Sequence, residues 1–547
     1  MNLLISQFLK KNWLIISSLV VIFLIGFSIR VFNLWDNVIF AYDQARDAQR
    51  IVEIITKGDL KLVGPETDIP GVFNSPLLYY LLAPVYLIFN FNVNFAALFF
   101  ILLDLSMVFV LYYVSVLLFE KKSVGILACL MWVFSYEFFA FSKLISNASL
   151  MVIGSIIFFT GLSLFIFRKK NIGLTISVVG LAISAGSNIY LGYLIFFYPI
   201  FFLYYKLKIS LKTFVLNSLL LILLLSTFLI SELKWNFQGF KALLYYTSGQ
   251  DLVIISQNFF NYFQKLSELL YFSFFSFNNF LALSIFIILV LVAVKMEKKR
   301  PELIFLLAWV FSTFPLFAFS SGVLNVHVGQ TTIFGAVTLL FALGINHILN
   351  NKTYRFLGLL LLLAIILGNL NLMAKDNFKA TSMLGGDQFL LKDEKAVIDY
   401  TYRQAKGDKF SVCAVTAPLY VNTLWGYIYY SHGKQSFGYL PFWSGQKQTL
   451  NEGLLAQADK KYDTRFLIIQ SDAPEYAVRA TVFLEDEISN VIETQKIGGT
   501  IVQKRQRKKE GEKFVDSQGL TARETEGVLK DIAKNPRFFC DVIESGN

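Results

Sequence analysis

The stretch AYDQARDAQRIVEII, residues 41–55, comes soon after an apolar run that ends near residue 29. Its charged residues Asp43, Arg46, Asp47 and Arg50 fall at positions i, i+3, i+4 and i+7. In an α-helix these positions share one face, which would carry two carboxylates and two guanidinium groups. Apolar residues follow the polar first turn, a pattern typical of a helix lying along a membrane surface. We therefore expect a charged helix just outside the first membrane segment.

Two interpretations of this charged face stay open on the residues alone. A solvated ladder of ion pairs within one helix would contribute about 0.2–0.5 kcal/mol per pair. Alternatively, a carboxylate acts as a general base beside an arginine that binds phosphate, the pairing that transfer of a sugar from a phosphate leaving group needs. The position of the stretch in the whole chain decides how much weight each interpretation carries.

Composition indicates a polytopic membrane protein. Hydrophobic residues make up 55% of the chain, with 56 Phe and 26 Tyr and a mean hydropathy of +0.57. Apolar runs of about 17 to 25 residues recur between residues 13 and 373, each long enough to cross a hydrocarbon core of roughly 30 Å as a helix. After residue 375 these runs stop. We expect an α/β domain over 376–505 and a charged, flexible tail over 506–547, in which residues 521–535 form one short helix.

The net charge of +11 has its origin in the membrane part. Residues 1–374 hold 25 Lys and Arg against 15 Asp and Glu, and the remainder holds 24 against 23. The excess lies in short loops, as cytoplasmic positive-inside clusters do, and not in a stripe that would bind nucleic acid. No nucleic-acid partner is expected. The clusters lie at 10–11, 121–122, 168–170, 206–212, 295–300 and 352–355.

Residues 75–89 decide the topology. This segment spans about 15 residues and contains two prolines, so it is short for a membrane span. If this segment is an interfacial or re-entrant helix and does not cross the membrane, every basic cluster lies on the cytoplasmic side. We then expect a multi-pass protein of the plasma (inner) membrane with a cytoplasmic N-terminus and an extracytoplasmic C-terminal domain. About eleven spans are expected, at 13–30, 94–118, 124–142, 149–167, 172–187, 189–205, 213–231, 271–294, 302–320, 329–349 and 354–374.

This topology places the long loops 30–75 and 232–270 on the outer side, and there the sequence resembles a known superfamily. The ordered stretches YDQARDA (42–48) and GDLKLVGPETDIPGVFNSPLLYYLLAP (58–84) are similar to the first outer loop of GT-C glycosyltransferases. The likeness is greatest to the branch of protein O-mannosyltransferases and lipid A aminoarabinose transferases. Looser matches are FSKLISNASL (141–150) and SELKWNF (231–237). The resemblance implies a GT-C type helical bundle with an extracytoplasmic α/β domain.

The same resemblance implies a function and a set of site residues. It implies inverting transfer of a sugar from a polyprenyl-phosphate-linked donor to an extracytoplasmic acceptor, which is a protein, a lipid or a glycan. Asp43 would be the general base. The implied residues are Asp43 and Asp47 for catalysis, Arg46, Lys143 and Lys234 for the donor phosphate, and Asn147, Glu232, His327 and Tyr79 for substrate binding.

The chain departs from the family pattern where some relatives bind a metal. It reads Asn-Ser-Pro at 74–76, whereas the aminoarabinose branch has Glu-Lys-Pro, so the metal-binding glutamate has no counterpart. A divalent metal stays an open alternative that no ligand cluster supports, and no other cofactor is expected. Three cysteines occur, at 129, 413 and 540, without a CxxC pair, so neither a disulfide framework nor a zinc site is expected.

Two alternatives remain. Asp104 lies about ten residues inside a span, where it is either functional or a core carboxyl held by a hydrogen bond. The whole chain could instead be a transporter of lipid-linked sugars or a non-catalytic scaffold of an envelope assembly. A transporter would be expected to show internal repeats or paired broken helices, and no repeat is visible in the sequence.

Overall fold

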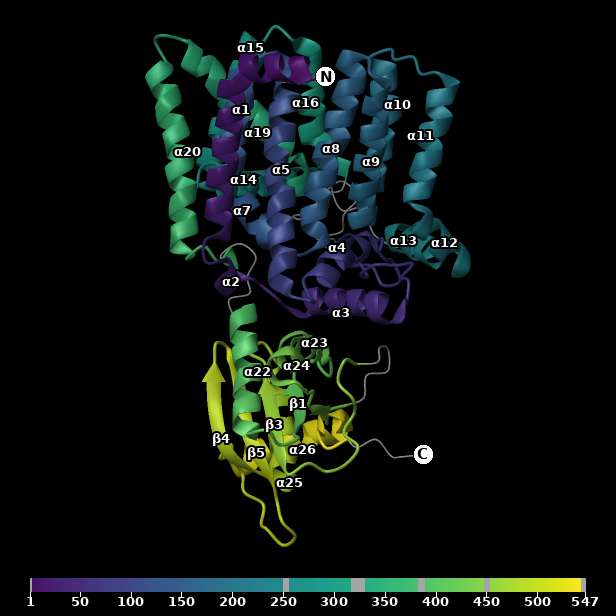
Figure 1. The fold of residues 1–547 in the computed structure, drawn as a ribbon, viewed down its shortest axis with the longest axis vertical. Helices are drawn as coiled ribbons and strands as arrows, with labels where there is room; N and C mark the ends of the chain where they lie inside the picture. The colour runs from purple at the N-terminus through teal and green to yellow at the C-terminus, as the bar shows by residue number, and fades with distance from the viewer. Residues whose placement is uncertain (1, 249–254, 316–329, 382–388, 447–452, 543–547) are drawn as a thin grey trace. The chain divides into compact units, whose positions relative to one another are not determined.

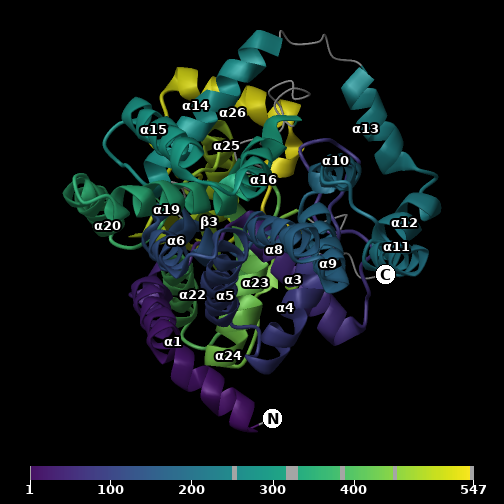
Figure 2. The ribbon, with the colours of Figure 1, turned by 90° about the horizontal axis from the view of Figure 1, so that it is seen from above.

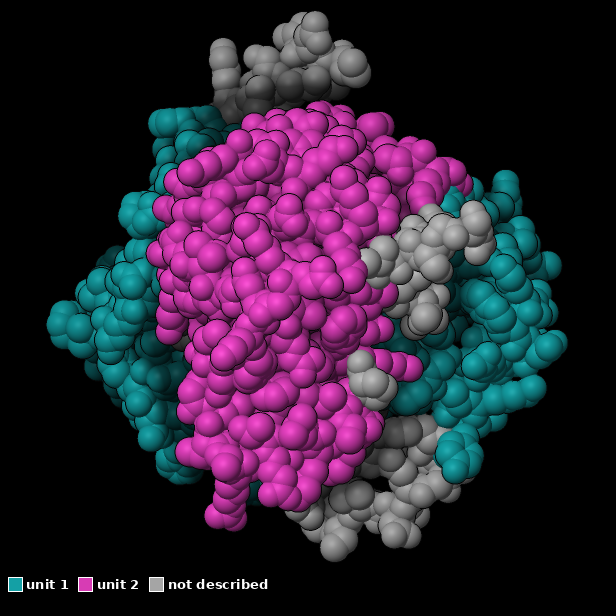
Figure 3. Space-filling model, turned by 90° about the horizontal axis from the view of Figure 1, so that it is seen from below, with its two compact units in different colours: residues 1–34, 59–84, 95–384 teal, residues 35–58, 85–94, 385–547 magenta. Residues whose placement is uncertain are grey.

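The computed structural model describes residues 2–248, 255–315, 330–381, 389–446 and 453–542. The chain divides into two compact units, which Figure 3 shows in different colours. Unit 1 comprises residues 1–34, 59–84 and 95–384, and unit 2 comprises residues 35–58, 85–94 and 385–547.

Unit 1 is a bundle of apolar helices (Figures 1 and 2). In the described residues, six helices are long and apolar enough to cross a membrane, or eight if each of two bent pairs is one span. The prediction of a helical membrane protein is thus confirmed. The six are α1 (Asn2–Val31), α5 (Val93–Phe119), α8 (Asn147–Arg168), α15 (Asn279–Met296), α19 (Phe334–Asn350) and α20 (Arg355–Lys375). The bent pairs are α6 (Lys122–Phe134) with α7 (Tyr136–Lys143), at 60°, and α11 (Leu211–Leu224) with α12 (Ser226–Lys234), at 58°.

Shorter helices stand where other spans are expected. The segment 172–187 is α9 (Asn171–Ser187), 189–205 is η1 (Ile189–Phe196) with α10 (Phe197–Tyr204), and 302–320 begins with α16 (Arg300–Val310) and η2 (Phe311–Thr313). The segment 75–89 forms α4 (Leu77–Ile88), a helix of 12 residues with Pro84 inside it. The remaining elements of unit 1 are α13 (Gln238–Ser248), α14 (Ile255–Ser273) and η3 (Thr331–Ile333).

Helices α8 and α9 pack with their backbones almost in contact, and Figure 1 shows them side by side. A Cβ atom added to Gly161 would lie 2.3 Å from the backbone nitrogen of Ser177. One added to Gly180 would lie 2.2 Å from that of Phe158. Small residues permit such close approach where lipid supplies no hydrophobic drive between helices. The 17-residue α9 is therefore tied to the long α8 along its length.

The buried Asp104 forms an ion pair inside the bundle. Arg30 on α1 places its Nε 3.0 Å from Asp104 Oδ2 on α5, and the Arg30 side chain is fully buried. Arg30 also donates to the carbonyl of Val133 on α6, at 3.1 Å. Because the charge of Asp104 is matched by an arginine, the structural interpretation of Asp104 accounts for its presence in a span.

Unit 2 contains a mixed sheet of five strands in the order β2-β1-β3-β5-β4. Strands β2, β1 and β3 are parallel, and β5 and β4 are antiparallel to their neighbours. The strands are β1 (Ser411–Val415), β2 (Phe442–Trp443), β3 (Thr464–Ile469), β4 (Ser489–Ile497) and β5 (Thr500–Arg507). The helices are α2 (Leu34–Asn37), α3 (Tyr42–Lys57), α22 (Leu391–Ala405), α23 (Thr423–Ile428), α24 (Lys434–Phe437), α25 (Glu475–Ile488) and α26 (Ala522–Lys534), with the short helices η4 (Tyr429–Gly433) and η5 (Pro536–Phe538).

The sheet of unit 2 has helices on both faces. Alternate residues of β3 point to opposite sides, as the pleat requires. Leu467 and Ile469 join a core with Ala477 and Phe483 of α25. On the other face, Phe466 packs edge-on to the ring of Tyr400 from α22, with 6.4 Å between ring centroids.

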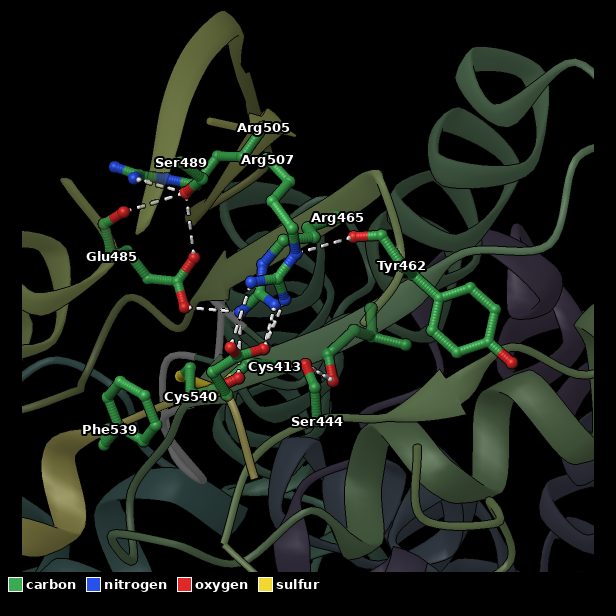
Figure 4. A network of polar contacts seen from close by, with 12 residues as sticks. Cys413, Ser444, Tyr462, Arg465, Glu485, Ser489, Arg505, Arg507, Phe539 and Cys540 are labelled. Atoms are coloured by element: carbon green, nitrogen blue, oxygen red, sulfur yellow. Dashed lines mark hydrogen bonds and ion pairs between the residues drawn. A yellow bond between two sulfur atoms is a disulfide. The ribbon is translucent and has the colours of Figure 1, made fainter. Parts of the chain in front are cut away.

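The structure corrects the expectation about the cysteines and confirms a helix in the C-terminal segment. Cys413 on β1 is bonded to Cys540, 127 residues later, so unit 2 does contain a disulfide. The short helix expected over 521–535 is confirmed as α26, which a capping box between Thr521 and Glu524 begins. Most of this segment is folded because residues around Cys540 are anchored in the polar network of Figure 4.

Glu394 on α22 provides a test of the packing of unit 2. Its side chain is buried and neither carboxylate oxygen has a hydrogen-bond partner among the described residues. Burial, with the nearby charge of Asp393, raises the pKa of Glu394 well above its ordinary value. A raised folded pKa costs stability as pH rises above the unfolded value of about 4.3. We therefore expect Glu394→Gln to raise the melting temperature at pH 7, with little difference near pH 4. Thermal unfolding followed by circular dichroism measures both, and an equal effect at the two pH values would contradict the account.

Candidate functional site

The expected charged helix is α3, and the sequence sets both of its ends. At its start, the backbone N–H of Ala41 donates to Gln44 Oε1 at 3.0 Å. At its end, Gly58 takes the left-handed conformation, with φ of 67°, and its N–H donates to the carbonyl of Ile54. A helix fixed in this way holds its side chains in defined positions.

The apolar face of α3 differs from the expectation of a helix resting on lipid. Ile51 and Val52 are buried in protein. α3 packs against α23, which lies more than 360 residues later in the same unit. Beside this contact, the rings of Phe40 and Tyr427 lie 5.3 Å apart. α3 is therefore held by unit 2 itself.

Arg46 lies between two of the carboxylates of α3, Asp43 and Asp47. Its Nη1 donates to Asp43 Oδ1 at 2.8 Å, and its Nε donates to Asp47 Oδ1 at 3.0 Å. The Asp43 side chain is 68% exposed, whereas those of Arg46 and Asp47 are 23% and 9% exposed. The three residues thus combine an accessible carboxylate, a partly accessible guanidinium group and a buried carboxylate.

Arg50 belongs to a different pair. Its Nη1 donates to Glu53 Oε2 at 3.0 Å, and the Glu53 side chain is 8% exposed. The four-residue face is therefore split into a cluster around Arg46 and a separate pair one turn later.

Lys143 and Asn147 stand at the junction of α7 and α8 in unit 1. The Nζ of the buried Lys143 donates to the carbonyl of Phe378 at 2.6 Å and lies 4.4 Å from the ring centroid of Phe139. Asn147 is the first residue of α8, after Ser146. Among the described residues, neither Asn147 Oδ1 nor Ser146 Oγ has a hydrogen-bond partner, although both atoms are buried. The start of α8 therefore presents unsatisfied polar atoms.

The remaining residues predicted to bind the donor phosphate or the substrate belong to unit 1. Glu232 Oε2 accepts from the backbone N–H of Phe240 at 3.1 Å, which links α12 to α13. The exposed Lys234 lies over the ring of Trp235, at 5.4 Å from its centroid. Tyr79 on α4 is 2% exposed. His327 falls outside the described residues.

The structure thus brings together Asp43, Arg46 and Asp47, all on α3. The other described candidates belong to unit 1, and their approach to α3 stays a prediction. No group of three or more His, Cys, Asp or Glu side chains that could hold a metal ion occurs in the described part of the chain.

A polar cluster that no sequence pattern indicates surrounds the carbonyl group that Lys143 contacts. The hydroxyl of Tyr136 donates to Asp376 Oδ2 at 2.6 Å, and Thr381 donates to Asp376 Oδ1 at 2.9 Å. Asp376 follows directly after α20, where a sequence pattern indicates only the end of a span. These bonds hold the segment that carries Phe378 near α7, so they position the partner of Lys143.

Comparison with known proteins identifies the fold. No family model and no curated protein matches this sequence. Among solved structures, ArnT from Cupriavidus metallidurans bound to undecaprenyl phosphate is 10% identical, with 91% of this chain and 98% of that chain covered and a TM-score of 0.55. The same protein in the apo state gives 10% identity, coverage of 90% and 98%, and a TM-score of 0.57. The chain therefore has a GT-C-like fold similar to that of ArnT, and the resemblance found in the sequence is confirmed for the fold.

Proposed function

We propose that this chain is an integral-membrane glycosyltransferase that moves a sugar from a polyprenyl-phosphate donor to an extracytoplasmic acceptor with inversion. The observation that carries the proposal is the likeness to ArnT over nine-tenths of the chain, in a structure described as bound to undecaprenyl phosphate. The cluster around Arg46 also supports the proposal, because an arginine beside an exposed carboxylate offers both a group that binds phosphate and a general base.

In the proposed reaction, Asp43 takes the proton of an acceptor hydroxyl group. The hydroxyl oxygen forms a bond to the anomeric carbon of the donor sugar, from the side opposite the phosphate. The bond between that carbon and the phosphate oxygen breaks, and its electron pair leaves with the polyprenyl phosphate. Arg46 stabilises the negative charge that develops there.

The geometry of α3 divides the work between the two carboxylates. Asp43 is the exposed partner of Arg46, and Asp47 is the buried one. A donor phosphate at the exposed side of Arg46 competes with Asp43 for the guanidinium group, which releases the Asp43 carboxylate toward the acceptor. Asp47 keeps the guanidinium group oriented, so it acts as a positioning residue. Lys143, Lys234, Asn147, Glu232, Tyr79 and His327 are proposed to complete the donor and acceptor sites from unit 1.

The orientation in the membrane is part of the proposal. The disulfide between Cys413 and Cys540 supports an extracytoplasmic location for unit 2, because disulfides persist in oxidising compartments. The basic clusters support a cytoplasmic N-terminus and about eleven spans, in which the shorter elements α9, η1 with α10, and α16 also cross the membrane. The compartment is the plasma (inner) membrane.

A direct assay tests the function. Membranes containing the protein are given undecaprenyl phosphate that carries a radiolabelled sugar, together with an extract of envelope lipids and glycans. Transfer of label to an acceptor, with release of undecaprenyl phosphate, is the expected result. Label that stays on the donor but moves across the bilayer would instead support a transporter and would contradict the proposal.

Substitution of Arg46 by lysine separates charge from geometry. Lysine keeps the positive charge but cannot bridge both carboxylates as the fork of arginine does. We expect Arg46→Lys to lower the transfer rate by about 10- to 100-fold, a loss of roughly 1.4–2.7 kcal/mol in transition-state binding. Arg50→Lys is the matched control, because Arg50 pairs with Glu53 and not with either aspartate of the cluster. Equal losses in the two variants would contradict the role given to Arg46.

A further inference from the structure

Unit 2 contains a cavity of about 630 Å³ at the carboxyl end of β3. Its walls come from three elements: the end of β3, the first turns of α25, and the hairpin of β4 and β5. At this place the sheet changes from parallel to antiparallel pairing, because β3 is parallel to β1 and antiparallel to β5. Ligands of open α/β sheets bind outside the carboxyl ends of strands, and small-molecule sites have roughly 300–1,000 Å³.

The cavity combines an apolar wall with the side-chain amide of Gln470. Ile469, Val478 and Ile501 supply the apolar wall. Gln470, the residue after β3, also lines the cavity and is only 4% exposed. Its backbone N–H donates to the carbonyl of Val415, but its side-chain amide forms no hydrogen bond within the described residues. The amide atoms stay accessible from the open cavity, so the site suits a ligand that offers both a donor and an acceptor to this amide.

The charges at the cavity balance. Lys496, on the hairpin wall, has no ion pair among the described residues. On the opposite wall, Glu475 is paired with Arg479 at 2.6 Å, and Arg479 also reaches Glu524 at 3.4 Å. Two positive and two negative groups thus stand at or near the opening. An anionic ligand would meet the carboxylate of Glu475, and a cationic ligand would meet Lys496, so a neutral ligand fits best.

We propose that this cavity binds a neutral sugar unit of the acceptor, which makes the acceptor a glycan or a glycolipid. A pyranose ring has an apolar C–H face that suits the isoleucine and valine wall, and its hydroxyl groups both donate to and accept from an amide. The ammonium group of Lys496 and the carboxylate of Glu475 provide further partners for hydroxyl groups at the rim. The link to an acceptor rests on the proposed glycosyltransferase function, whereas sugar binding at the cavity does not.

Saturation-transfer-difference NMR on the full chain in nanodiscs tests the site. The probes are neutral disaccharides of glucose, mannose and N-acetylglucosamine, with inorganic phosphate as a competitor. We expect at least one disaccharide to bind, and Gln470→Leu to weaken it by about tenfold, which corresponds to the loss of one well-formed hydrogen-bond pair. Ser471→Trp, at an exposed wall position, is expected to fill the cavity and to abolish the signal. Gln495→Leu is the matched control, since the exposed Gln495 precedes Lys496 on β4 and does not line the cavity.

Each outcome decides one question. Binding that Gln470→Leu and Ser471→Trp both weaken, and that Gln495→Leu leaves unchanged, supports the site. Absence of disaccharide binding, or displacement of the sugar by millimolar phosphate, overturns it. The proposed function has a separate readout: if Asp43→Asn abolishes transfer while no sugar binds at the cavity, only the further inference fails. If the cavity binds sugar but Asp43→Asn transfers normally, the catalytic assignment fails and sugar binding stands.

Discussion

Asp43→Asn is expected to lower the rate of sugar transfer by roughly 100- to 10,000-fold while the protein folds and inserts normally. Positioned general bases contribute about this much to enzymatic proton transfer. Asparagine has nearly the same shape but cannot take a proton from the acceptor. Because Asp43 is 68% exposed and α3 is fixed by its caps and by burial of its apolar face, the substitution leaves the helix intact. The measurement is the single-turnover rate of transfer from labelled undecaprenyl-phosphate sugar.

The control for this variant is Asp36→Asn. Asp36 lies on α2, which precedes α3 in the chain, is exposed, and undergoes the same chemical change. Its transfer rate should stay within about twofold of the wild-type rate, a difference below roughly 0.5 kcal/mol. The transfer rate of Asp47→Asn should lie between those of Asp43→Asn and Asp36→Asn, because Asp47 orients Arg46 and takes no proton. If Asp43→Asn transfers sugar at the same rate as Asp36→Asn, the general base is another group.

The sequence predicts α3 well because its signals are local. The spacing of four charged residues, a polar first turn and a glycine after the last turn are all contained in residues 41–58. The pairing of these charges also follows from their spacing along one helix. Arg46 pairs with Asp43 and Asp47, and Arg50 pairs with Glu53, three residues later. The local pattern does not predict which surface the apolar face of α3 packs against. α23 covers that face from another part of the chain, so an amphipathic pattern alone also fits a lipid surface.

Unit 2 contains further contacts that local sequence patterns do not predict. A chain with three cysteines gives no reason to choose the pair Cys413 and Cys540, which are 127 residues apart. The charged residues after 505 resemble a solvated tail, because their partners lie elsewhere in the sequence. Asp541, for example, lies between Arg465 on β3 and Arg507 at the end of β5. Such pairs become visible only when the order of the strands is known.

Arg465→Ala is expected to lower the free energy of unfolding of unit 2 by about 3–5 kcal/mol, the usual cost of removing one member of a buried ion pair. In the network of Figure 4, Arg465 donates to Glu485 at 2.7 Å, to Asp541 at 2.6 Å and to the carbonyl of Cys540 at 2.9 Å. The side chains of all three charged residues are at most 7% exposed. Alanine would leave two buried carboxylates with too few partners, and the segment that bears Cys540 would lose one of its anchors. Urea unfolding of the full chain in detergent, read by pulse proteolysis of unit 2, gives the free energy.

Arg479→Ala is the matched control for Arg465→Ala. Arg479 also pairs with two carboxylates, Glu475 and Glu524, but these side chains are 78% and 42% exposed. Exposed pairs of this kind contribute about 0–1 kcal/mol, so the control should unfold close to the wild-type urea concentration. Arg465→Lys, which keeps the charge without the fork, should lie between the two variants. If Arg479→Ala lowered the free energy of unfolding as much as Arg465→Ala does, burial of the network would not explain its contribution to stability.

The pH dependence of unit 2 gives the same network a second readout. Burial alone would raise the pKa of the Asp541 carboxyl, but hydrogen bonds and charges from Arg507 and Arg465 outweigh it and hold that pKa below its ordinary value. A carboxyl group with a lowered folded pKa contributes stability that is complete above its unfolded pKa of about 3.9 and is lost as pH falls through the folded value. The wild-type protein should therefore lose stability below about pH 4, and Asp541→Asn, already destabilised at pH 7, should lose less over the same range. Parallel stability curves for the two proteins between pH 7 and pH 3 would contradict the pairing of Asp541 with the two arginines.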